Sequence, residues 1–109
     1  METQKEFRLE SILSVITGYV FTNSIDEVLE LFWFMYDDPF IDTTGIYFLR
    51  KEAKKHILNI HPELKSVKLN KKDNKLEWIN NQIELFGDTL QISKIGKPLD
   101  NTKQPTLCL

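Results

Sequence analysis

The sequence predicts a single small α+β domain with three main helices and a small antiparallel sheet. The length of 109 residues corresponds to one domain, and the 41% hydrophobic content is sufficient for a folded core. Long stretches with apolar residues at steps of three and four predict helices, and shorter β-favouring stretches between them predict strands. We expect a flexible arm over residues 1–8, one globular domain over residues 9–95 and an extended tail over residues 96–109.

The most apolar stretch, residues 24–38, predicts the central helix. Ser24 and Glu27 have the spacing of a capping box, in which the serine oxygen accepts a backbone N–H and the glutamate reaches back. Apolar side chains cover nearly all sides of its last turn. The helix therefore lies in the core or, alternatively, buries its aromatic surface against a partner or in a homo-oligomer. The Asp-Asp-Pro sequence that follows predicts its end.

The other two main helices and one short helix show the same periodicity. Two of them are followed by glycine and one by His-Pro, which are common ways for a helix to end. Thr43 or Thr44 is expected to cap the middle one of the three. The predicted bounds of these helices are residues 9–17, 46–60 and 76–86. Short strands are predicted at residues 19–22, 65–69 and 90–92.

Several features predict a cytoplasmic protein. Cys108 is the only cysteine, so no internal disulfide can form, and a reducing compartment is expected. The first ten residues carry charges of both signs and no apolar run of the signal-peptide type. No stretch approaches the roughly 18 apolar residues that a membrane span requires. We therefore expect no membrane association.

Charge is distributed unevenly along the chain. Residues 1–44 carry two basic and nine acidic residues, whereas residues 45–75 carry nine basic and three acidic ones. Such a separation of charge can steer a charged partner toward one side of the protein. Alternatively, the two blocks neutralise each other across the fold.

Signatures of catalysis and metal binding are weak. His56 and His61 are five residues apart, whereas two ligands on one helix face are three or four apart. Ser14 lacks the glycine-flanked turn of a hydrolase nucleophile. Adjacent carboxylates at Asp37 and Asp38 diverge at a helix end and are poorly placed for shared acid–base work. We therefore predict no catalytic residue, no metal site and no cofactor.

Two sets of residues are candidates for binding. Hydroxyls and free backbone N–H groups at a helix start can hold an anion, so a nucleotide ligand is expected to contact Ser14, Thr17, Thr43, Thr44, Arg50 and Lys51. Aromatic anchors dominate protein interfaces, so a protein partner is expected to contact Trp33, Tyr36, Asp37 and Asp38. The basic block over residues 50–75 raises nucleic acid as a third partner. Its interruption by acidic residues and the chain's pI of about 5.7 argue against that partner.

Three short motifs are similar to a family of small phage-encoded proteins of unknown function. The first is residues 13–18, LSVITG. The second is the helix over residues 25–36 with Asp37, Asp38 and Phe40 after it, followed by His-Pro-Glu-Leu at residues 61–64. The third is Trp78 with the sequence FGDTL at residues 86–90. The likeness spans residues 11–92, and the chain departs from the family pattern at residue 19 and at residues 43–45.

The resemblance implies a non-enzymatic bacteriophage accessory protein that acts against a host defence. Such a protein is expected to bind a host protein or to sequester a nucleotide immune signal in the host cytoplasm. The alternatives are a small nucleic-acid-binding regulator that uses the basic block, and a small nucleotide-processing enzyme.

Overall fold

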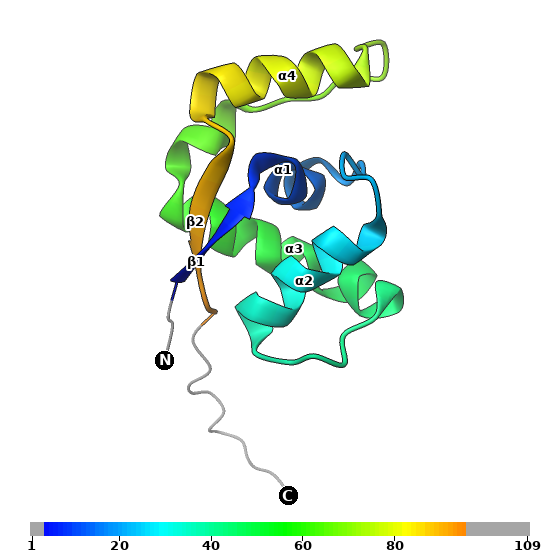
Figure 1. Ribbon diagram of the computed structural model, residues 1–109, viewed down its shortest axis with the longest axis vertical. Coiled ribbons are helices and arrows are strands. Elements are labelled where there is room, and N and C mark those ends of the chain that lie inside the picture. The colour runs from blue at the N-terminus through cyan, green and yellow to red at the C-terminus, as the bar shows by residue number, and fades with distance from the viewer. Residues whose placement is uncertain (1–3, 96–109) are drawn as a thin grey trace, which may run out of the picture.

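The computed structural model describes residues 4–95 (Figure 1). Within them the chain forms a small α+β domain, as predicted, with a two-stranded antiparallel sheet. Figure 1 shows α4 at one end of the molecule, α2 and α3 at the other, and α1 between them. The elements in chain order are β1 (Gln4–Arg8), α1 (Leu9–Thr17), α2 (Ile25–Tyr36), α3 (Thr43–Ile60), the 3-10 helix η1 (Pro62–Ser66), α4 (Lys75–Phe86) and β2 (Thr89–Ser93).

The sheet joins the two ends of the described chain. Strand β1 pairs with β2 in a register that runs from Gln4 opposite Ser93 to Arg8 opposite Thr89. Phe7 of β1 is buried in the core. The prediction of a flexible arm is therefore wrong for residues 4–8, and residues 1–3 lie outside the described residues. The strand escaped prediction because its partner is more than 80 positions away and only one of its side chains is apolar.

Backbone carbonyls on the other edge of β2 are hydrogen-bonded by two histidines, His56 within α3 and His61 at the end of that helix. His56 Nε2 lies 2.8 Å from the carbonyl oxygen of Ser93, and His61 Nε2 lies 2.6 Å from that of Gln91. A carbonyl oxygen can only accept, so both Nε2 atoms carry a proton and donate it. These contacts attach β2 to α3. One edge of β2 therefore pairs with β1, and carbonyls on the other edge bond to the histidines.

Helix α2 lies in the core, as its periodicity predicted. Leu31, Phe32 and Met35 are fully buried. Ser24 caps the helix, but its Oγ accepts from the N–H of Asp26 at 3.0 Å. The glutamate half of the predicted capping box instead lies beside Arg8 of β1, with 3.7 Å between the two charged groups.

Three other local predictions are wrong. Residues 19–22 form a loop, because Phe21 N–H donates to Ser14 Oγ and its ring stacks on Trp78 instead of joining a strand. Residues 62–66 form η1, whose Leu64 is buried, so no strand forms over residues 65–69. Helix α3 begins at residue 43, and its cap is Asp42, whose carboxylate accepts the N–H of Gly45 at 2.9 Å.

Helix α4 and strand β2 follow their predicted positions closely, and α4 ends at Gly87 as expected. The predicted tail over residues 96–109, with Cys108, lies outside the described residues. Among residues 4–95, no helix combines the length and the apolar content needed to cross a membrane.

We predict that Phe7→Ala lowers the free energy of unfolding by about 3–5 kcal/mol, because it removes a buried aromatic ring and leaves a cavity under the sheet. Urea unfolding monitored by circular dichroism measures the change. Gln4→Ala is the control, because this exposed residue of the same strand is three positions from Phe7 and so points to the opposite face of the sheet; we expect a change within about 0.5 kcal/mol. Equal stability of the two variants would show that β1 is not part of the cooperative fold.

Candidate functional site

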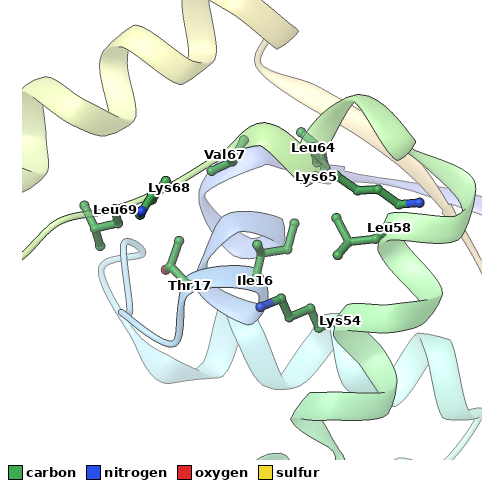
Figure 2. Close-up of a pocket in the computed structure, with 9 residues that line it drawn as sticks. All are labelled: Ile16, Thr17, Lys54, Leu58, Leu64, Lys65, Val67, Lys68 and Leu69. Atoms are coloured by element: carbon green, nitrogen blue, oxygen red, sulfur yellow. The ribbon is translucent and has the colours of Figure 1, made fainter.

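A hollow of about 370 Å³ lies where the end of α1 meets α3 and the segment that follows η1. Its wall combines apolar side chains with lysines and with the hydroxyl-bearing side chain of Thr17 at the end of α1. Figure 2 shows the side chain of Lys54 extending from α3 toward Ile16 and Thr17, and that of Lys65 extending from η1 toward α3. The apolar residues of the wall are Ile16, Leu58, Leu64, Val67 and Leu69.

A second hollow of about 350 Å³ adjoins the first and shares Lys54, Leu58 and Lys65 with it. The two together form one continuous surface, which we call the lysine groove. Within residues 4–95, no acidic residue lines either hollow. The basic residues that line the groove are Lys51, Lys54, Lys55, Lys65 and Lys68.

Helical spacing explains how α3 supplies three of these lysines. Lys51, Lys54 and Lys55 are separated by steps of three and one, so with Leu58 they share one side of the helix. The opposite side carries Ala53 and Ile57, which are fully buried and fix the rotation of α3 against the core. The other two lysines come from η1 and the residues after it.

The lysine side chains of the groove form no ion pair within the described part of the protein. None of its five ammonium groups has a hydrogen bond or an ion pair with any residue between 4 and 95. By contrast, Lys94 pairs with Asp37 at 3.0 Å, and Lys75 donates to the carbonyl of Asp73 at 3.1 Å. Like charges around one hollow raise the local positive potential, so the groove attracts an anion.

The walls of the groove supply ammonium groups, the hydroxyl of Thr17, the side-chain amide of Asn59 and an apolar surface. Among the described residues, no histidine, cysteine or carboxylate lines them. Across residues 4–95, no group of three or more metal-ligating side chains comes together.

Arg50, one of the predicted ligand residues, instead holds the end of α1. Its Nε donates to the carbonyl of Val15 at 2.8 Å and its Nη2 to that of Ile16 at 3.1 Å. These carbonyls belong to the last turn of the helix, where carbonyl oxygens have no N–H donor within the helix itself. Gly18 follows with φ of 84°, and a Cβ there would lie 3.0 Å from the guanidinium carbon of Arg50. A glycine is therefore needed for both the conformation and the close approach.

The two predicted α1 residues have structural hydrogen bonds. Ser14 is buried, donates from Oγ to the Glu10 carbonyl at 2.6 Å and accepts from Phe21 N–H. Thr17 Oγ1 donates to the Leu13 carbonyl at 2.8 Å, yet the residue also lines the groove.

Of the six predicted ligand residues, the structure thus brings Thr17 and Lys51 to the groove. Thr43 and Thr44 are exposed at the start of α3 and line neither hollow. The other four lysines of the groove were not predicted as ligand residues, although all of them belong to the basic block over residues 50–75. Their joint placement depends on η1 and on the packing of α1 against α3, which periodicity does not show.

The predicted partner residues hold the end of α2 to its surroundings. Trp33 Nε1 donates to the Ile41 carbonyl at 2.7 Å, and Asp38 Oδ1 accepts from the N–H of Phe40 at 3.0 Å. Tyr36 donates to Glu52 Oε1 at 2.8 Å.

Burial of the ring, together with the hydrogen bond and negative charge of Glu52, raises the pKa of Tyr36, so the hydroxyl stays protonated. Asp37 ends α2 with φ of 54° and pairs with Lys94. The four predicted partner residues are thus engaged in contacts within the protein.

We predict that Arg50→Met lowers the free energy of unfolding by about 1–3 kcal/mol, because it leaves two carbonyls of α1 unsatisfied. Lys51→Met, one position further along α3, should change stability by no more than about 0.5 kcal/mol. Urea unfolding of both variants measures the difference. Equal stability would remove the structural role that we assign to Arg50.

Comparisons with protein-family models, curated proteins and solved structures return no match to this chain.

Proposed function

We propose that this protein acts by binding and that the lysine groove holds a phosphate-bearing small molecule. The observation that carries the proposal is the set of five lysines without partners among the described residues, which surround an apolar floor. Ammonium groups form strong charge-assisted hydrogen bonds with phosphate oxygens. The apolar floor adds a surface for the uncharged part of the ligand.

The size and shape of the groove support a small ligand. Its two hollows of about 370 and 350 Å³ fall in the usual range for small-molecule sites, about 300–1,000 Å³. The described walls hold no histidine, cysteine or carboxylate, which favours sequestration over turnover. The predicted host-protein surface around Trp33 and Tyr36 receives less support, because both residues are engaged internally.

The resemblance to small phage-encoded proteins supplies the biological setting of the proposal. In that setting the ligand is a nucleotide immune signal of the host, and the protein acts as a counter-defence factor in the host cytoplasm by keeping the signal from its receptor. This setting rests on the motif likeness, whereas the ligand class rests on the groove.

A paired set of charge variants tests the groove. We predict that Lys54→Met with Lys65→Met lowers the affinity for ATP and for inorganic triphosphate at least about tenfold, because both lysines line both hollows. Isothermal titration calorimetry at fixed salt measures the affinities. Lys71→Met with Lys72→Met is the matched control, because it removes the same charge from an exposed turn that lines neither hollow.

Equal losses in the two double variants would show that the effect is one of net charge and that the groove is not the site. Mass spectrometry after incubation and heating separates binding from turnover. Recovery of intact ATP agrees with sequestration, and recovery of a product would contradict it.

A further inference from the structure

Two aromatic rings on α3 are left outside the core. Tyr47 is 80% exposed and Phe48 is 74% exposed, and their rings form an edge-to-face pair with centroids 5.5 Å apart. Most other aromatic side chains of the described chain pack inward, as Phe32 does, or stack on a neighbour, as Phe21 does on Trp78. Exposure of two adjacent rings to water is unfavourable, so their burial under a ligand would contribute favourably to the free energy of binding.

These rings lie in line with the lysine groove. Tyr47, Lys51, Lys54 and Leu58 are separated by steps of four, three and four, so they form a stripe along one side of α3. The last three of them line the groove. With a rise of 1.5 Å per residue, about 10 Å of helix separates Tyr47 from Lys54. A molecule with a planar ring at one end and phosphates at the other can therefore contact both.

We propose that Tyr47 and Phe48 form a stacking platform for a nucleobase at the end of the lysine groove. The ligand is then a nucleotide unit, with its base on the aromatic rings and its phosphates on the lysines. This inference rests on the proposed function and adds the base to it. Aromatic side chains beside a positively charged groove are the combination by which proteins hold single-stranded nucleic acid without reading its sequence.

The charges beside the rings favour this ligand over a protein. Lysine is depleted in the centre of protein interfaces, whereas here Lys51 follows the rings within one turn of the helix. Two sources share the proposed chemistry, a free nucleotide and a single strand. The stripe from Tyr47 to Leu58 covers about 16 Å of helix, so it has room for either.

The experiment compares ligands with and without a base. The probes are ATP, inorganic triphosphate, a short oligothymidylate and an abasic oligonucleotide of the same length. We expect Tyr47→Ala to weaken ATP binding about 5- to 100-fold and to leave triphosphate binding unchanged. Tyr47→Phe keeps the ring and should retain the affinity. Leu85→Ala on α4, at a side chain 73% exposed, is the control for loss of exposed apolar surface.

The same titrations distinguish a free nucleotide from a single-stranded nucleic acid as the ligand. Tighter binding of the oligothymidylate than of ATP, together with weak binding of the abasic strand, identifies single-stranded nucleic acid. The reverse order identifies a free nucleotide.

Failure of this inference and failure of the proposed function give different results. If triphosphate binds as tightly as ATP, and Tyr47→Ala affects neither, the platform is wrong and the groove stands. If none of the four probes binds, both are wrong.

Discussion

The contact between Arg50 and the end of α1 is the constraint on which the arrangement of the site depends. Two N–H groups of one guanidinium reach two successive carbonyls, of Val15 and Ile16. This attaches α3 to α1 and holds Ile16 and Thr17 opposite Lys54 and Leu58 of the groove. Arginine suits the position because its planar group holds donors on two separate nitrogens in a fixed geometry, whereas a lysine ammonium carries all its donors on one rotatable nitrogen.

The charge asymmetry of the chain has a consequence in three dimensions. Several acidic residues of the N-terminal block form ion pairs away from the groove. Glu10 and Glu27 pair with Arg8, and Asp37 pairs with Lys94. The lysines of the groove have no such partners among the described residues. The two blocks of charge therefore do not cancel through ion pairs at the groove, and a local positive site remains on a protein whose net charge is −2.

Local signals predicted much of the fold. The helix after Ser24, the helix that ends at Gly87 and strand β2 could be placed because their caps and periodicity lie within a few residues. Strand β1 could not, since its evidence is the distant pairing partner. Helix α3 begins three residues before its predicted start at residue 46, because Asp42 and neither of the two threonines caps it.

The candidate site was predicted less completely than the fold. The basic block was visible, but the choice between Arg50 as a ligand residue and Arg50 as a cap depends on how α1 packs against α3. The formation of η1 in place of a strand likewise decides where Lys65 and Lys68 lie. Both are tertiary effects, and neither is encoded in a short window of sequence.

We propose the lysine groove, and not the acidic end of α2, as the binding site. Two-dimensional ¹H–¹⁵N NMR of the labelled protein during titration with ATP distinguishes the two surfaces. We predict saturable shifts of the backbone amides of Thr17, Lys54, Leu58, Lys65 and Lys68, with those of residues 33–38 unchanged. Shifts centred on residues 33–38, or no saturable shift at all, would contradict the account.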